Sequence, residues 1–289
     1  MKEVSGGNGL FKLLQISRPG LWLVFVWLYL WPTGGRWELF SSSKFWAGLG
    51  YVTFPLNLLV YGMNDLVDED VDYNNPRKGN YIYGAKSTKQ ERAFLPLTIF
   101  ASNAFSILLI CYLSGSWLYC ISWLFGAFGV NFLYNNEPFK FSRRFPYEVP
   151  TMIVGHLMIP LLACEINGLP YPEIGSWLFN ILLLARSHIW LEFADISCDA
   201  KEGKRTFAVV FGPRIAFRAV IVLTAFESLV AFVFLQSVVL SMFSLFGIVV
   251  FSLSATNSGV KEEKVHVSIS QSIIGAALMM YIWIERVFK

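Results

Sequence analysis

Long apolar segments follow one another along the chain, separated by turns and polar loops. Nine of them are near twenty residues long and apolar enough for a membrane-spanning helix. They cover roughly residues 20–40, 45–63, 93–113, 116–134, 147–164, 176–194, 215–235, 238–257 and 268–287. The first is the weakest, because Pro32 and the pair Gly34–Gly35 interrupt it. The pattern predicts an all-α polytopic membrane protein of about nine transmembrane helices.

The placement of basic residues tests this topology, because Lys and Arg in short loops stay on the cytoplasmic side of a membrane. With the N-terminus in the cytoplasm, 18 of the 23 Lys and Arg residues fall on that side. The exceptions are Arg36, Lys44, Arg286 and Lys289, which fall outside, and Arg186, which falls inside a span. The distribution predicts a cytoplasmic N-terminus, with the long polar loops 64–92, 135–146 and 195–214 on the same side.

The composition agrees with a bilayer environment. The 289 residues are 55% hydrophobic and 15% charged, far more apolar than a soluble domain. The net charge of +3 reflects the Lys and Arg residues that gather in the cytoplasmic loops. It therefore gives no reason to expect a nucleic-acid partner. The spacing of the four cysteines does not predict a zinc site. The first apolar run does not predict a signal peptide. Without a linker or low-complexity tract, residues 1–289 are predicted to form a single transmembrane domain.

The loop at 64–92 opens with a dense acidic run, NDLVDEDVD, at residues 64–72. An α-helix turns about 100° per residue, so Asn64, Asp68 and Asp72 at positions i, i+4 and i+8 share one face. Asp65, Asp68 and Asp72 give the alternative spacing i, i+3 and i+7. Either choice leaves a continuous stripe of oxygen ligands where the apolar span 45–63 ends.

A second acidic stretch lies at the end of the span 176–194. His188, Glu192, Asp195 and Asp199 project within about 60° of one another on the same helical count. Three carboxylates on so narrow a face repel one another unless a cation lies among them. Asp65 and Asp195 are 130 residues apart, and basic residues follow both stretches, which hints at an ancient duplication.

Carboxylate and amide oxygens are the ligands that hard divalent cations prefer. Mg²⁺ in particular binds a few carboxylates and completes its shell with water and phosphate oxygens of a substrate. The alternative is that both acidic stretches are solvated cytoplasmic loops whose charges only help to orient the protein in the membrane. Acidic residues, however, contribute little to membrane topology. An EF-hand is excluded, because Tyr73 and Gly79 stand where its glycine and closing glutamate are needed. The two stretches are therefore predicted to hold magnesium and a diphosphate between them.

Three segments of the chain carry motifs in a fixed order. The run NDLVDEDVD contains NDxxDxxxD, and ADISCDAKEGKRTFAVVFG at 194–212 contains DxxxD with a trailing Gly, Thr and Phe-Gly. Between them, LYNNEPFKF at 133–141 is similar to a Tyr-Ser-x-Pro-Pro-x-Arg segment. It keeps Tyr134 and Pro138, places Lys140 at the basic position, and departs at Asn135 and Glu137. The set resembles the UbiA superfamily of intramembrane prenyltransferases over nearly the whole chain.

This resemblance implies a Mg²⁺-dependent enzyme with a central cavity that opens near the cytoplasmic face. It would transfer an isoprenyl group from an allylic isoprenyl diphosphate donor to a lipophilic acceptor within the lipid bilayer. NNPRKGNYIYGA at 74–85 is similar to the Asn-Pro-Arg-Lys-Gly segment of lycopene elongases, so a carotenoid-like acceptor is one expectation. A quinone precursor is the other, and the resemblance leaves the oligomeric state open.

The motifs carry the expected site residues. Metal ligands are expected at Asn64, Asp65, Asp68, Asp72, Asp195 and Asp199. Contacts to the substrate are expected from Arg18, Arg77, Lys78, Lys140, Glu192, Lys204 and Arg205. The expected catalytic residues are the carboxylates Asp68, Asp72, Asp195 and Asp199, with Tyr134 as the aromatic side chain that shields the allylic cation. His188, Glu192 or His156 would take the proton lost after the acceptor attacks.

Other functions start from the same residues. A UbiA-type terpene cyclase would fold one donor onto itself and need no acceptor. A transporter would spread its acids through the membrane depth, whereas here they gather on one face. Arg186, a cation inside a span, is a functional candidate unless Glu165, Glu227 or a backbone carbonyl partners it.

Overall fold

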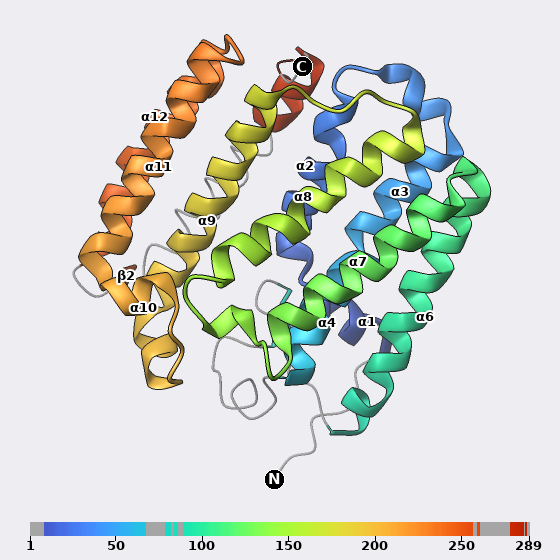
Figure 1. Cartoon of the computed structure of the whole chain (residues 1–289), viewed down its shortest axis with the longest axis horizontal. Coiled ribbons are helices and arrows are strands. Elements are labelled where there is room, and N and C mark those ends of the chain that lie inside the picture. The colour runs from blue at the N-terminus through green and yellow to red at the C-terminus, as the bar shows by residue number, and fades with distance from the viewer. Residues whose placement is uncertain are drawn as a thin grey trace. The chain divides into compact units, whose positions relative to one another are not determined.

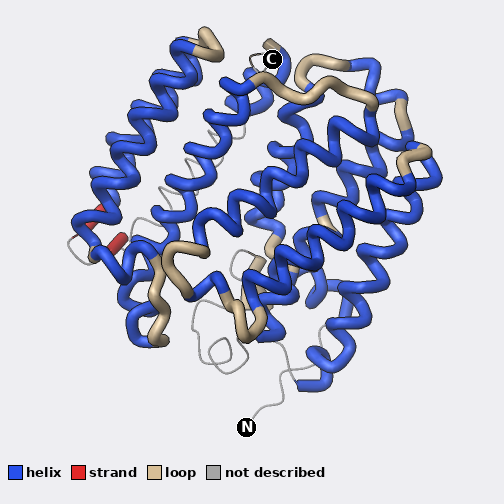
Figure 2. Tube along the Cα trace, in the orientation of Figure 1, coloured by secondary structure: helices blue, strands red, loops and turns tan. Residues whose placement is uncertain are grey.

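The computed structural model describes residues 9–67, 79–81, 84–85, 89–256, 259–260, 278–285 and 287. Within them the structure is helical apart from turns and one short antiparallel pair of strands, β1 (Ala255–Thr256) and β2 (Gly259–Val260) (Figure 2). The all-α prediction is confirmed. The chain divides into two compact units, each described below by itself. The first comprises Met1–Phe139 with Gly155–Leu169, and the second comprises Lys140–Val154 with Pro170–Lys289.

The first unit contains most of the helices. They are α1 (Gly9–Ile16), α2 (Trp22–Leu30), α3 (Ser43–Thr53), α4 (Pro55–Val67), α6 (Lys89–Ser114), α7 (Trp117–Asn135) and the later part of α8 (Glu148–Asn167). Short 3₁₀ turns at Pro19–Leu21, Trp31–Thr33 and Trp37–Ser41 flank α2. Helix α4 packs against α1, α3, α6 and α7 (Figure 1). The acidic run begins in its last turn, so its first residues start from a helix held on several sides.

The second unit is built around the longest helix, α9 (Ile174–Lys201). It also contains the start of α8, the short α10 (Phe207–Phe211), α11 (Pro213–Val233) and α12 (Val238–Ser254). Helix α11 packs against both α9 and α12, and α10 packs against α9 and α11 (Figure 1). All four members of the second acidic stretch lie on the continuous helix α9, as the sequence predicts.

Two predicted spans differ from the observed helices, and a proline marks one boundary of each. The span predicted at 45–63 is two helices, α3 and α4, because Pro55 has no N–H to donate and restricts the backbone of Phe54 before it. The first apolar stretch runs over Gly9–Thr33 and so begins earlier than the predicted 20–40. Pro32 lies in the 3₁₀ turn that ends it, as the interruption in the sequence indicates.

Among the described residues, six helical stretches are long and apolar enough to cross a membrane. They are Gly9–Thr33, Arg92–Ser114, Trp117–Asn135, Glu148–Asn167, Ile174–Lys201 and Pro213–Val233. Helix α12 is apolar but shorter. Most of the last predicted span, 268–287, lies outside the described residues. The polytopic membrane fold is confirmed, whereas the count of nine spans and the central cavity stay predictions.

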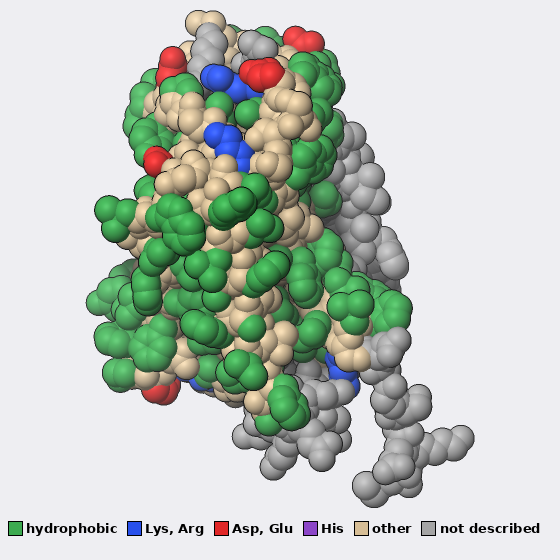
Figure 3. All heavy atoms as spheres, turned by 90° about the vertical axis from the view of Figure 1, so that its right-hand side faces the viewer, with side chains coloured by type: hydrophobic (Ala, Val, Ile, Leu, Met, Phe, Trp, Pro, Cys, Tyr) green, Lys and Arg blue, Asp and Glu red, His purple; other side chains and the backbone are tan. Residues whose placement is uncertain are grey.

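Hydrophobic side chains cover much of the face of the first unit that Figure 3 shows. Along α6 the large exposed ones are Phe94, Leu97, Phe100, Phe105, Leu108, Leu109 and Tyr112. Charged side chains gather in the upper and lower parts of that view, and the middle is mostly green. A row of exposed aromatic and aliphatic side chains this long is expected to contact lipid tails.

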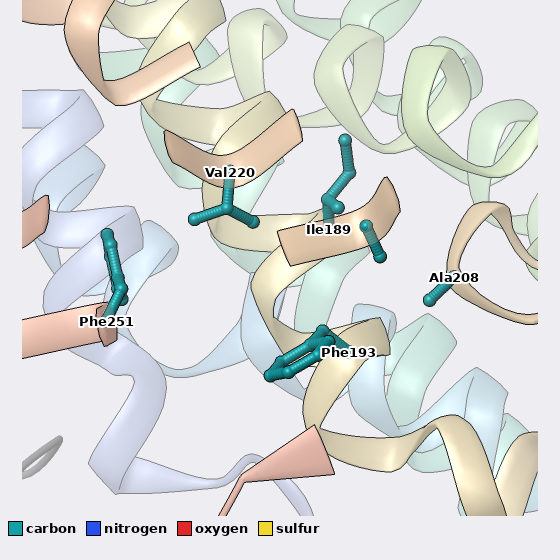
Figure 4. Close-up of a cluster of buried hydrophobic side chains, with 6 residues drawn as sticks. Ile189, Phe193, Ala208, Val220 and Phe251 are labelled. Atoms are coloured by element: carbon teal, nitrogen blue, oxygen red, sulfur yellow. The ribbon is translucent and has the colours of Figure 1, made fainter. Parts of the chain in front are cut away.

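A buried apolar cluster holds the second unit together beside the acidic part of α9. It contains Ile189 and Phe193 of α9, Ala208 of α10, Ala216 and Val220 of α11, and Phe251 of α12 (Figure 4). Trp190 stacks on Phe193 with their ring centroids 5.4 Å apart. Because Ile189 and Phe193 directly follow His188 and Glu192 in the chain, this packing fixes the direction in which the acidic stripe leaves α9.

Arg186, the cation predicted inside a span, has a carboxylate partner in the second unit. Its Nε lies 2.5 Å from Glu227 Oε2, and Ser244 Oγ donates to Glu227 Oε1 at 2.8 Å. The guanidinium also lies over the Phe251 ring, 5.4 Å from the centroid. The Glu227 side chain is 1% exposed. The pairing with Glu227 is thus the alternative that holds, and it ties α9 to α11 and α12.

We expect Glu227→Ala to destabilise the protein by about 3 kcal/mol, because it leaves the Arg186 guanidinium buried without a counter-charge. Thermal unfolding in detergent measures the loss. The double variant Arg186→Met/Glu227→Leu should recover most of it, since a well-packed apolar pair replaces the ion pair. The exposed Glu285→Ala is the matched control, with a change within about 0.5 kcal/mol. A Glu227→Ala protein as stable as the wild type would contradict the role of the pair.

Candidate active site

In the first unit, the end of α4 carries an acid that a cation holds in place. Asp65 is buried, with a side chain 5% exposed, and its Oδ1 accepts a hydrogen bond from Arg18 Nη2 at 2.8 Å. Arg18 follows α1 in a left-handed conformation, with φ 51° and ψ 69°. Its guanidinium lies over the Tyr61 ring, 4.7 Å from the centroid. Tyr61 and Asp65 are one turn apart on α4, so both hold Arg18 from the same helix face.

The end of α7 meets the same part of α4. Asn64 donates its Nδ2 to Asn135 Oδ1 at 3.3 Å. Asn135 is the last residue of α7 and is 2% exposed, and Tyr134 beside it is half-buried. The third motif of the chain therefore begins directly against the first motif.

In the second unit, the acidic stripe on α9 ends in a cation. Asp199 Oδ1 and Glu202 Oε2 lie 2.8 and 3.0 Å from Lys204 Nζ. Burial alone would lower the pKa of Lys204, but the carboxylates of Asp199 and Glu202 outweigh that effect and raise its pKa above the ordinary value. Lys204 therefore carries its positive charge at physiological pH.

Two glutamates hold the segment that follows the second motif. Glu148 is fully buried, and its Oε1 accepts from the backbone N–H of Phe207 at 2.8 Å. Glu192 Oε2 accepts from the N–H of Ala208 at 3.2 Å, and Glu192 Oε1 lies 3.3 Å from His188 Nε2. Both carboxylates thus satisfy N–H groups at the start of α10, which have no helical partner.

The loop before α8 runs alongside the same segment. Arg205 donates its N–H to the carbonyl of Arg143 at 2.9 Å, and Phe145 donates to the carbonyl of Arg205 at 2.6 Å. The loop that contains Lys140 and the segment that contains Lys204 and Arg205 are therefore tied together by backbone hydrogen bonds. Several of the predicted diphosphate contacts share this one surface region of the second unit.

The structure thus places most of the predicted site residues in two groups. Asn64, Asp65, Arg18 and Tyr134 lie at the ends of α1, α4 and α7 in the first unit, and Lys140, Glu192, Asp195, Asp199, Lys204 and Arg205 lie in the second unit. Asp68, Asp72, Arg77 and Lys78 lie outside the described residues. The prediction that both acidic stretches face one cavity stays a prediction.

Two residues that the sequence does not predict as site residues, Glu148 and Asn135, contact the motif segments in the structure. Glu148 stands at the start of an apolar helix, and an acid in the first turn of such a helix is the only signal that could have found it. Asn135 appears in the sequence as a departure from the family motif, and its contact with Asn64 is visible only in the fold.

Each unit by itself carries oxygen groups of the kind that binds a divalent cation. Asn64 and Asp65 lie at the end of α4 in the first unit, and Asp195 and Asp199 lie near the end of α9 in the second. Cations stand beside two of the acids, Arg18 beside Asp65 and Lys204 beside Asp199. In the described part of the chain, no group of three or more His, Cys, Asp and Glu side chains is arranged to hold a metal by itself.

Apolar spans that end in paired acids and cations define a polytopic helical membrane protein with charged groups gathered at its helix ends. The chain belongs to the UbiA prenyltransferase family, whose model matches residues 20–266. It is therefore a prenyltransferase.

Curated relatives and solved structures agree with this family. A lycopene elongase/hydratase of Corynebacterium glutamicum is 29% identical over 219 residues, 73% of each chain. One of Haloarcula japonica is 28% identical over 69% of this chain and 67% of its own. The fold is similar to that of a UbiA homolog from Archaeoglobus fulgidus solved with GPP and Mg²⁺. That match has a TM-score of 0.69 and 19% identity, and covers 96% of this chain and 99% of that one.

We expect Glu148→Ala to speed hydrogen exchange at the backbone amides of residues 206–210, because the Phe207 N–H loses its acceptor. Hydrogen–deuterium exchange with mass spectrometry measures this. Glu173→Ala is the matched control, since Glu173 precedes α9 without a side-chain capping bond and should leave exchange unchanged. Equal exchange in the wild type and the Glu148→Ala variant would contradict the anchoring role.

Proposed function

We propose that this protein transfers an isoprenyl group from an allylic isoprenyl diphosphate to a carotenoid-like acceptor in the membrane, in a Mg²⁺-dependent reaction. The observation that carries the proposal is the acid–cation pair within each acidic motif region, Arg18–Asp65 in the first and Lys204–Asp199 in the second. The curated relatives support the acceptor class, because they are named lycopene elongase/hydratases. Their alignments with this chain cover about two thirds or more of both sequences.

The two ion pairs suggest how a diphosphate would be received. Each pair already holds a carboxylate and a cation within 2.8 Å of one another at the end of an apolar helix. A diphosphate with its metal ions brings both signs of charge. The carboxylates would turn to the metal, while Arg18 and Lys204 would turn to the phosphate oxygens. The free protein thereby keeps both groups neutralised until the substrate arrives.

The donor needs its allylic C–O bond to break, and charge then develops on the leaving diphosphate. Bound Mg²⁺ would supply Lewis-acid stabilisation of that charge. We assign the ligand oxygens to Asn64, Asp65, Asp68, Asp72, Asp195 and Asp199, as the motifs predict. Arg18, Arg77, Lys78, Lys140, Lys204 and Arg205 would hold the phosphate oxygens and stabilise the leaving group.

The cation that remains must be shielded from water until the acceptor reaches it. Tyr134 is half-buried at the end of α7, one residue from the contact between α4 and α7, which suits an aromatic face near the reacting carbon. Proton loss from the coupled product needs a base. His188 is the better candidate, because Glu192 already accepts the N–H of Ala208 and so has a structural task on the substrate-binding side.

Expression in bacteria that make lycopene tests the proposal. Mass spectrometry of the lipid extract should reveal lycopene enlarged by one or two prenyl units, and an Asp195→Asn variant should abolish this product. Purified protein with Mg²⁺ and the donor alone should release little diphosphate. A cyclic hydrocarbon under that condition would instead identify a terpene cyclase, and prenylated quinone precursors in a quinone-making host would replace the carotenoid acceptor.

We expect Lys204→Gln to lower the rate of diphosphate release by about 10- to 100-fold, because it removes a cation from the developing charge of the leaving group. A coupled phosphate assay with purified protein, Mg²⁺, the donor and lycopene as acceptor measures this. Lys201→Gln is the matched control, since Lys201 is exposed three residues earlier in the same region. Equal rates for the two variants would remove Lys204 from the diphosphate site.

A further inference from the structure

Three asparagines connect α7 to the first motif inside the first unit. Asn131 and Asn135 are one turn apart on α7, and each donates its Nδ2 to the backbone carbonyl four residues earlier. The distances are 2.9 Å to Ala127 O and 3.0 Å to Asn131 O. Asn64 of α4 then donates its Nδ2 to Asn135 Oδ1 at 3.3 Å. Asn131 and Asn135 are 9% and 2% exposed, so these bonds have little competition from water.

The backbone decides which way each amide in this row faces. A carbonyl oxygen only accepts, so Asn135 must turn its NH₂ group toward Asn131 O. Its own oxygen then faces α4, and Asn64 can meet that oxygen only with its NH₂ group. The carbonyl oxygen of Asn64 is thereby held on the side of the amide away from Asn135. The carbonyl of Asn131 in α7 therefore sets the orientation of the Asn135 amide, and Asn135 in turn sets the orientation of Asn64, the first residue of the acidic motif.

We propose that Asn135 is a positioning residue for the metal site, which fixes the amide of Asn64 so that its oxygen is the atom offered to the cation. The proposal rests on the function proposed above. A reversed Asn64 amide would point its NH₂ group at the metal, and an N–H donor cannot be a ligand. The bond at 3.3 Å is long for an N–H···O contact, so its effect is one of direction more than of stability. Groups that orient a ligand in this way typically change metal affinity by about 10- to 100-fold.

Asn135 is also a residue at which the third motif departs from the family segment, and its positioning role gives a physical reason for that departure. The family segment has Ser at the position of Asn135, and a serine hydroxyl ends one bond earlier along the side chain. An asparagine reaches further and carries a separate donor and acceptor, so it can be tied to α7 and still face Asn64.

Binding of Mn²⁺ tests the proposal without turnover. Mn²⁺ replaces Mg²⁺ as a probe for electron paramagnetic resonance, and an unreactive thiolodiphosphate analogue of the donor completes the site. Asn135→Leu removes the amide at similar volume and should raise the Kd for Mn²⁺ by about 10-fold. Asn131→Leu is the matched control, because it removes a neighbouring buried amide but keeps the backbone carbonyl that orients Asn135. Its Kd should stay at the wild-type value.

The orientation is tested by repeating the change in the Asn64→Asp background. A carboxylate offers an oxygen on either side, so its orientation no longer depends on Asn135. Asn135→Leu should then change the Kd for Mn²⁺ by less than about 2-fold. A merely structural role would give the same loss in both backgrounds, and that result would overturn the proposal. If Asn135→Leu does not fold, Asn135→Ser allows the same comparison.

Failure of the proposed function would look different. If the wild-type protein binds no Mn²⁺ with the donor analogue, the metal site itself is refuted and the positioning role falls with it. If the wild type binds Mn²⁺ and Asn135→Leu binds it equally well, only the positioning role is refuted.

Discussion

Charge within the apolar helices of this protein is tolerated only where another charge or a hydrogen bond meets it, because these helices are long and apolar enough to lie in hydrocarbon. Within the spans a lone ion or backbone dipole has no water to solvate it. The pair of Arg186 and Glu227, with the Ser244 hydroxyl on the same carboxylate, follows from this constraint. The pairs at the helix ends, Arg18 with Asp65 and Lys204 with Asp199, obey the same rule in a different place.

The position of a pair decides what it can do. Arg186 and Glu227 lie among α9, α11 and α12, so breaking their contact would leave two buried charges, and the pair serves the fold. At the helix ends, the proposed function has a charged substrate replace either partner. Arg18 and Lys204 would then change from neutralising an acid to holding a phosphate. The same kind of contact would be permanent within the bundle and exchangeable at the helix ends.

Hydrogen bonds to backbone N–H and C=O groups hold the loops around the proposed site in place. Glu148 and Glu192 accept the N–H groups that open α10, and the strand-like contact between residues 143–145 and Arg205 places several cations in one region. In the first unit the carbonyl of Asn131 orients Asn135, which orients Asn64. Side chains near a metal or phosphate act well only when their direction is fixed, and here the fixed direction comes from helix ends.

Periodicity and composition alone determined the class of this protein. Apolar stretches about twenty residues long predict spanning helices because the bilayer sets their length, and the acidic motifs are local patterns that a helix keeps on one face. The sequence therefore yields the all-α membrane fold and the continuous acidic stripe on α9, and the resemblance of its ordered motifs indicates the prenyltransferase family. The break before Pro55 was missed, although local sterics cause it, because hydropathy averages over a proline. Only the tertiary structure decided which partner Arg186 takes, that Glu148 anchors Phe207, and that Asn135 meets Asn64. Those contacts join residues 41, 59 and 71 positions apart, and no local pattern encodes which distant helices pack together.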